Sequence, residues 1–210
     1  MQLVAENLVL ERGGRNVVDG LSLRLEGGAA LVLTGPNGSG KSTLLRSLAG
    51  YLRPASGSVR IIGAGDDREA SEVCHFVGHL DGIKTHLTAA ENLAFWATYL
   101  GGSAGLAARV EAALQRFALV ALADIPAGYL SAGQKRRLAL ARLVAAERPL
   151  WLLDEPTVSL DTSSIEVLTA AINAHLAAGG MVAIATHVPM HLAPMQQIRL
   201  GPVAQAEAQP

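Results

Sequence analysis

The sequence has 210 residues, 50% of them hydrophobic, and a formal net charge of −1 at pH 7. This length suits one globular domain, the hydrophobic content excludes a disordered chain, and the near-zero charge provides no basic field for nucleic acid. No apolar run reaches the roughly 18 residues of a membrane helix, no secretory signal pattern opens the chain, and one cysteine cannot form an internal disulfide. We therefore expect a cytoplasmic protein that binds no nucleic acid and works at a membrane only through a partner.

The first half of the chain alternates strands with helices. An apolar strand is expected over residues 29–34, between a Gly-Gly turn and a glycine-rich loop that leads into a helix. A short strand follows in "SGSVRIIG", and the apolar segment 73–77 is a further strand. From residue 88 to about 117 the pattern becomes helical, with a break at "GGSAG".

The second half continues this alternation. A helix is expected from Ser131 to about Glu147, and "PLWLLDEP" is a short apolar strand that ends in two acids. Another helix follows Asp161, and "MVAIATH" is a second buried strand.

This order of elements predicts an α/β fold. Apolar strands that alternate with helices indicate a mainly parallel sheet with helices on its faces. We expect one domain over residues 1–205, which includes a small helical subdomain over about 88–147. The tail, residues 206–210, carries no core pattern and is expected to be loose.

The glycine-rich loop matches a phosphate-binding motif at every fixed position. It follows an apolar strand and opens a helix, which is the context that the motif requires, so a turn with an unrelated lysine is the minor alternative. Glycines let backbone N–H groups converge on phosphate, and the helix N-terminus adds a positive dipole. We expect Lys41 to reach the β- and γ-phosphates, Ser42 to bind Mg²⁺ and Thr43 to donate to the α-phosphate. The nucleotide-binding residues predicted here are Gly35, Pro36, Asn37, Gly38, Ser39, Gly40, Lys41, Ser42 and Thr43.

Two acids end the strand in "LWLLDEP". Ligands bind in such sheets at the carboxyl ends of the strands, so Asp154 is placed to hold Mg²⁺ through water. Glu155 follows and is expected to act as the general base that polarises the attacking water. A solvated Asp-Glu turn without function is the alternative, which the phosphate loop upstream makes the weaker one.

The segment "LSAGQ", residues 130–134, has two interpretations. Ser131 and Gln134 form the pattern of a capping box, which begins helices in many proteins. A cap does not require Gly133. The segment resembles the LSGGQ signature of ATP-binding cassette (ABC) ATPases, with Ala132 in place of the first glycine.

Other cassette elements stand in the order that this family has. "SLD", residues 159–161, resembles the D-loop, and His187 in "IATH" resembles the switch histidine. The resemblance covers nearly the whole chain. It implies a P-loop NTPase fold of the ABC type, in which an N-terminal antiparallel β portion and a small helical subdomain accompany the parallel core sheet. It also implies ATP hydrolysis coupled to transport, with ATP and Mg²⁺ as ligands and His187 in a catalytic role.

The resemblance explains why one chain carries two phosphate-binding elements. In ABC ATPases two cassettes form a head-to-tail homodimer, and the signature turn of one covers the ATP in the phosphate loop of the other. By this resemblance four residues contribute to a nucleotide site shared between chains: Ser131, Gly133, Gln134 and Asp161.

Two positions depart from the common cassette pattern. Many cassettes stack adenine on an aromatic residue after the first strand, and Arg12 occupies that position here; a guanidinium can also stack on a base. The loop before the helical subdomain commonly carries a glutamine that senses Mg²⁺ and the γ-phosphate. His79 occupies that position, so the resemblance gives it a catalytic role.

The sequence "VGHLDGIKTHLTAAENLAFW" resembles the same loop in ATPase subunits of cytochrome c maturation (haem exporter) systems. In cassettes this loop receives the membrane subunit, so integral membrane subunits are expected to dock near residues 79–92, at the cytoplasmic face of the inner membrane. The implied process is haem delivery, or release of a haem-loaded chaperone. The alternatives are another small ABC exporter with lipid, drug or peptide cargo, and a soluble non-transport ABC ATPase.

Several histidines and basic residues are expected to have no ligand. Cys74, His75 and His79 lack the C-x-x-C-H haem-attachment pattern, so no direct haem site is expected and Cys74 should pack in its strand. "KRR", residues 135–137, is expected to be a solvated helix face. Surface positions are expected for three histidines: His86, His175 and His191.

Overall fold

The structure is a computed structural model that describes residues 1–63, 68–201 and 208–209. The chain divides into two compact units. The first comprises Met1–Gly78, Pro149–Glu155 and Ile172–Pro210, and the second comprises His79–Arg148 and Pro156–Ala171.

A three-stranded antiparallel sheet with the order β2-β1-β4 lies in the first unit. Its strands are β1 (Gln2–Arg12), β2 (Arg15–Glu26) and β4 (Ser56–Ile62). Along β2, buried Leu21, Leu23 and Leu25 alternate with exposed Ser22 and Arg24, because successive side chains of a strand point to opposite faces. The expected N-terminal antiparallel β portion is confirmed.

The second sheet of this unit has six strands in the order β5-β6-β7-β3-β8-β9, parallel except for the β8–β9 pair. The strands are β3 (Ala30–Thr34), β5 (Cys74–Val77), β6 (Leu150–Asp154), β7 (Met181–Ala185), β8 (Met195–Arg199) and β9 (Ala208–Gln209). Every residue of β6 and β7 is buried, as expected for central strands of a parallel sheet. The predicted mainly parallel core sheet is confirmed.

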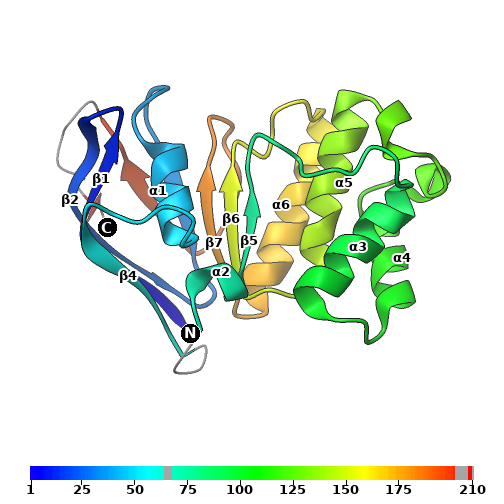
Figure 1. Ribbon diagram of the computed structural model, residues 1–210, viewed down its shortest axis with the longest axis horizontal. Coiled ribbons are helices and arrows are strands. Elements are labelled where there is room, and N and C mark those ends of the chain that lie inside the picture. The colour runs from blue at the N-terminus through cyan, green and yellow to red at the C-terminus, as the bar shows by residue number, and fades with distance from the viewer. Residues whose placement is uncertain (64–67, 202–207, 210) are drawn as a thin grey trace. The chain divides into compact units, whose positions relative to one another are not determined.

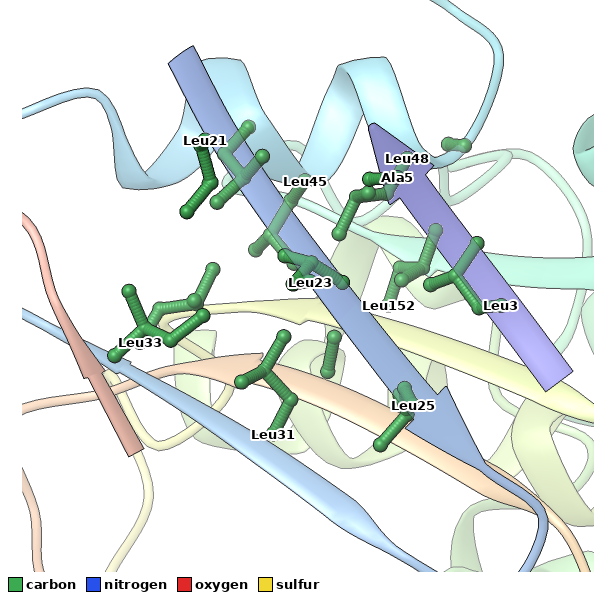
Figure 2. Close-up of a cluster of buried hydrophobic side chains, with 14 of the residues drawn as sticks. Leu3, Ala5, Leu21, Leu23, Leu25, Leu31, Leu33, Leu45, Leu48 and Leu152 are labelled. Atoms are coloured by element: carbon green, nitrogen blue, oxygen red, sulfur yellow. The ribbon is translucent and has the colours of Figure 1, made fainter. Parts of the chain in front are cut away.

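The hydrophobic core of the first unit joins both sheets to the helix α1 (Lys41–Leu48). Figure 2 shows leucines of β1 and β2, leucines of β3 and β6, and Leu45 and Leu48 of α1 in one buried cluster. Since α1 contacts β1, β6 and β7, the loop that precedes it is held against the carboxyl end of β3. The core therefore fixes the position of the phosphate loop.

The second unit is helical. Its helices α3 (Ala89–Gly101), α4 (Leu106–Arg116) and α5 (Ala132–Ala145) pack against one another (Figure 1). Thr88 and Glu91 form a capping box that begins α3, and two short 3₁₀ turns, Val120–Leu122 and Ala127–Tyr129, lead into α5. The helix α6 (Thr162–Ala177) follows the D-loop segment.

Three elements differ from the sequence-based expectation. The short helix α2 (Ala70–Val73) and the strand β8 were not predicted; β8 is short and mostly exposed, so it has no apolar pattern. Ala208 and Gln209 pair with β8, whereas 206, 207 and 210 lie outside the described residues, and the loose tail stays a prediction. The bounds of one domain over 1–205 and of its subdomain over 88–147 stay a prediction. Within the described parts of the chain, none of the helices combines the length and apolar character needed to cross a bilayer.

Candidate active site

The phosphate loop joins β3 to α1 through positions that require glycine. Gly35 has φ 131°, and a Cβ there would lie 2.0 Å from the carbonyl oxygen of Leu200. Gly40 precedes α1 with φ 99°, in the left-handed region that favours glycine. Any larger residue at either position would displace the loop from the end of β3.

The loop and the first turn of α1 form a cradle that fits phosphate. No side chain caps α1, so the backbone N–H groups of its first turn are available to an anion. The hydroxyl Oγ of Ser39 is buried and has no hydrogen-bond partner among the described residues. Lys41 is buried, and its Nζ donates to the carbonyl oxygens of Gly35 at 2.7 Å and Pro36 at 3.1 Å. The ammonium group thus lies across the loop that would hold the phosphates.

Ser42 and Asp154 meet next to this cradle. The Ser42 hydroxyl donates a hydrogen bond of 3.0 Å to Asp154 Oδ1, and Asp154 is only 1% exposed at the end of β6. Mg²⁺ prefers hard oxygen ligands beside a phosphate, and this hydroxyl and carboxylate supply that donor set. The residues present therefore fit the expected metal ion.

Glu155 is held in an unusual backbone conformation beside His187. Its φ is 48°, and its N–H donates to the carbonyl oxygen of Ala185 at 2.8 Å. The left-handed region costs a non-glycine residue roughly 1–3 kcal/mol, and such strain gathers at functional sites. The carboxylate Oε1 lies 3.4 Å from Nε2 of His187; the Glu155 side chain is 14% exposed and that of His187 is 54% exposed. Water can therefore reach the pair.

An open hollow of about 550 Å³ joins His187 to the phosphate loop. It is lined by Thr34, Gly35, Pro36, His187, Gln197 and Arg199. Arg199, on β8, is a cationic residue that sequence reasoning missed, because the exposed strand gave no signal. The hollow lies at the carboxyl ends of β3, β7 and β8, where nucleotides bind in parallel sheets.

In the second unit, the signature turn begins α5 as a capping box. Ser131 Oγ accepts a hydrogen bond from the Gln134 N–H at 3.2 Å, and Gln134 Oε1 accepts one from the Ser131 N–H at 2.8 Å. Both interpretations of "LSAGQ" are thus compatible, since the cap orders the turn. A Cβ at Gly133 would lie 2.9 Å from the carbonyl oxygen of Ser159, so the turn packs closely on the D-loop segment.

Asp161 has a structural role at the start of α6. Its Oδ1 accepts hydrogen bonds from the Ser164 N–H at 2.8 Å and the Ser163 hydroxyl at 3.1 Å. Hydrogen bonds from Ser164 and Ser163 lower the pKa of this exposed carboxyl. Its place in a shared nucleotide site stays a prediction.

The two departures from the cassette pattern are both exposed. Arg12 ends β1 opposite Arg15, and His79 begins the second unit. Their contacts with nucleotide stay predictions. Cys74 is 2% exposed within β5, which confirms that it packs in its strand, and His86 and His191 are exposed as expected.

The expected surface position of His175 is wrong. Its ring stacks on Trp151 with 4.0 Å between the ring centroids and 7° between the planes. Burial lowers the pKa of His175, while hydrogen bonds with the backbone of Met181 and Pro149 act in the opposite direction. A Cβ at Gly180 would lie 2.2 Å from His175 Nε2, so the glycine makes room for the ring.

The expectation that "KRR" is a solvated face is wrong for Arg136. This residue is 4% exposed, its Nη1 lies 2.7 Å from Asp81 Oδ1, and its Nε donates to the carbonyl oxygen of Pro156 at 3.1 Å. Helical periodicity could have predicted the burial of Arg136, because Arg136 shares a face with the buried Leu140 and Leu143, four and seven positions further along the helix.

A phosphate loop, a strand-end Asp-Glu pair and a histidine after the next strand, all on a mainly parallel sheet, define an ATPase of the ABC transporter class. The family model described as ABC transporter matches residues 18–158. The solved structure of an ATP-binding subunit of an ABC transporter superposes with a TM-score of 0.85 at 23% identity, covering 99% of this chain and 90% of that one. A dimeric ATP-binding cassette in a post-hydrolysis state with ADP and Pi gives 0.81 at 25% identity, with 98% of each chain covered.

Two curated relatives show to which family within the ABC transporter class the chain is similar. The cytochrome c biogenesis ATP-binding export protein CcmA of Agrobacterium fabrum is 48% identical over 212 residues, 99% of either chain. The protein of the same name from Paramagnetospirillum magneticum is 52% identical over 210 residues, 98% of this chain and 97% of that one. The chain belongs to the CcmA family of ABC transporter ATPases.

Proposed function

We propose that this chain is the ATP-hydrolysing subunit of a membrane ABC complex for cytochrome c assembly. In that complex it would drive haem delivery or the release of a haem-loaded chaperone. The assignment to this process is supported by full-length relatives named as cytochrome c biogenesis export proteins. The ATPase assignment rests on the arrangement at the carboxyl end of β6. There Asp154 accepts a hydrogen bond from Ser42, and the next residue in the chain, Glu155, lies beside His187.

The chain's own residues divide the work of hydrolysis. The amides of the phosphate loop and Lys41 bind the β- and γ-phosphates. Ser42, and Asp154 through water, would hold Mg²⁺, which would neutralise charge on the phosphates. Glu155 accepts a proton from the attacking water as the water oxygen bonds to the γ-phosphorus. The bond from the γ-phosphorus to the bridging oxygen breaks, so ADP leaves and phosphate is released. His187 orients the Glu155 carboxylate through the 3.4 Å contact.

The complete site requires a second chain. In the head-to-tail homodimer the signature turn (Ser131, Gly133 and Gln134) and Asp161 complete the partner's nucleotide site. Arg12 stacks on adenine, and His79 takes the place of the γ-phosphate sensor. Integral membrane subunits dock near residues 79–92, which places the chain at the cytoplasmic face of the inner membrane.

Co-purification from native membranes tests the proposal. The tagged chain is expected to bring down integral membrane proteins of a cytochrome c assembly complex, and that complex should hydrolyse ATP. The Lys41→Ala variant serves as control, because it should bring down the same proteins without hydrolysis. Recovery of membrane proteins that handle lipid, drug or peptide instead would contradict the cytochrome c assignment, and equal hydrolysis by Lys41→Ala would contradict the site.

A further inference from the structure

The turn Asp81–Gly82 is fixed by three side chains of the second unit. Arg136 pairs with the Asp81 carboxylate at 2.7 Å, and Arg142 Nη1 donates to the Asp81 carbonyl oxygen at 3.3 Å. Trp96 Nε1 donates to the carbonyl oxygen of Gly82 at 3.2 Å. These contacts hold the turn against the helices of the second unit.

Packing around Gly82 tightens the same turn. Its φ is 65°, and a Cβ there would lie 3.2 Å from the Trp96 ring and 3.3 Å from Arg142 Nη1. The Arg142 guanidinium in turn lies 4.9 Å from the centre of the Trp96 ring. Directly before this anchored turn stands Leu80, which is 89% exposed. The turn therefore presents a large apolar side chain to solvent from a rigid base.

Arg136 extends these contacts to a second segment. Its Nη1 faces Asp81, while its Nε donates to the carbonyl oxygen of Pro156 at 3.1 Å. Pro156 follows Glu155 directly in the chain. The Arg136 side chain is 5% exposed and that of Asp81 is 25% exposed, so water reaches the pair only from the aspartate side. The guanidinium reaches its two partners through separate nitrogen atoms, Nε and Nη1, held in one plane, whereas a lysine side chain has a single donor nitrogen.

We propose that Arg136 is a positioning residue that couples the Asp81–Gly82 turn to the segment after Glu155. A displacement of Pro156 when nucleotide binds moves Arg136, and Arg136 moves Asp81, so the presentation of Leu80 changes with the nucleotide state. This inference rests on the proposed function, because it takes the exposed residues near 79–92 as the surface that membrane subunits contact. A purely structural clamp would hold the turn still in every nucleotide state.

A fluorescent label on the turn tests the coupling without any membrane partner. Leu80→Cys provides an exposed thiol, and Cys74 is 2% exposed, so an environment-sensitive thiol reagent should label the new cysteine. Glu155→Gln in the same chain is expected to retain bound ATP. We expect the emission of the label to shift when Mg·ATP is added.

The arginine variants decide the outcome. Arg136→Lys keeps the charge but loses the two-directional contact, so the ATP-dependent shift should be lost while ATP still binds. Arg109→Lys is the matched control, because Arg109 also joins two segments, through the carbonyl oxygens of Ala145 and Gly102, but does not touch the turn. That variant should keep the full shift. If Arg136→Lys does not fold, Asp81→Asn removes the same ion pair from the other side and should also lose the shift.

Two results would overturn the coupling: no ATP-dependent shift in the parent chain, or a full shift in both folded Arg136→Lys and Asp81→Asn. Failure of the proposed function gives a different result, in which no membrane subunits co-purify with the wild-type chain. Because the label reports on the isolated chain, the two failures are distinguishable.

Discussion

The Ser42 hydroxyl donates a 3.0 Å hydrogen bond to Asp154 Oδ1, which joins two residues 112 positions apart in the sequence. The bond connects the first turn of α1 to the end of β6 and leaves two oxygen ligands side by side. We expect this hydrogen bond to break when a cation binds, so that the hydroxyl and the carboxylate can both interact with the cation.

Ser42→Ala should therefore raise the Mg²⁺ concentration needed for half-maximal ATP binding. ATP binding in the presence of a chelator should change little, since the backbone amides and Lys41 remain. Ser47→Ala is the control, because Ser47 is a buried serine of the same helix whose Oγ has no hydrogen-bond partner in the described part of the chain. Equal Mg²⁺ dependence in both variants, measured by nucleotide titration, would remove Ser42 from the metal site.

Glu155→Gln keeps the size of the side chain but removes the base. It should bind Mg·ATP, hydrolyse it at least about 10²-fold more slowly, and accumulate as an ATP-bound dimer. Phosphate release and size-exclusion chromatography measure the two effects. Glu147→Gln, at an exposed glutamate after α5, should behave as wild type. Normal turnover by Glu155→Gln would leave the strained φ of Glu155 without a catalytic explanation.

The change in the free energy of unfolding caused by Gly133→Ala shows whether packing or helix propensity dominates at this position, because the two effects have opposite signs. Alanine inside a helix stabilises by about 1 kcal/mol relative to glycine. Here the new Cβ would lie 2.9 Å from the Ser159 carbonyl oxygen, closer than such contacts allow, and overpacking costs roughly 1–3 kcal/mol. We expect a lower free energy of unfolding in a urea titration. A more stable variant would show that the signature turn and the D-loop segment do not constrain each other.

His175 is expected to make stability depend on pH. Burial holds its pKa below that of the unfolded chain, so the unfolded chain binds more protons as the pH falls. The stabilisation is complete above the unfolded value of about 6.5 and is lost as the pH falls through the folded pKa. His175→Phe keeps a ring against Trp151 without the titrating group, so its melting temperature should fall less than that of wild type between about pH 7 and 5. His191→Gln, at an exposed histidine, should retain the wild-type dependence, and an unchanged slope in His175→Phe would refute the assignment.

Local patterns predicted the parts of the fold that sequence neighbours determine. The phosphate loop, the apolar strands β6 and β7 and the cap at Ser131 all depend on residues a few positions apart. Contacts between residues far apart in the sequence were missed, because a short sequence pattern does not specify them. The burial of His175 depends on Trp151 of another element, and β8 is a strand because β3 pairs with it. Arg136 is an intermediate case, since its helical face was predictable but its partner Asp81 was not.

Mixed dimers test most directly the claim that each ATP site is built from two chains. One protomer carries Lys41→Ala and the other Ser131→Arg, and both carry Glu155→Gln so that bound ATP is trapped. Loss of the Ser131 cap costs roughly 1 kcal/mol, so the folding of each protein is first checked by its melting curve. If phosphate loop and signature turn act across chains, both lesions fall in one site and the other site is intact.

The measurement is the amount of ATP retained by the purified mixed dimer. The account predicts about one ATP per dimer, because a symmetric dimer builds its shared site twice, and none in either mutant homodimer. Folded mixed dimers that retain no ATP would contradict a shared site and leave "LSAGQ" as the cap of α5.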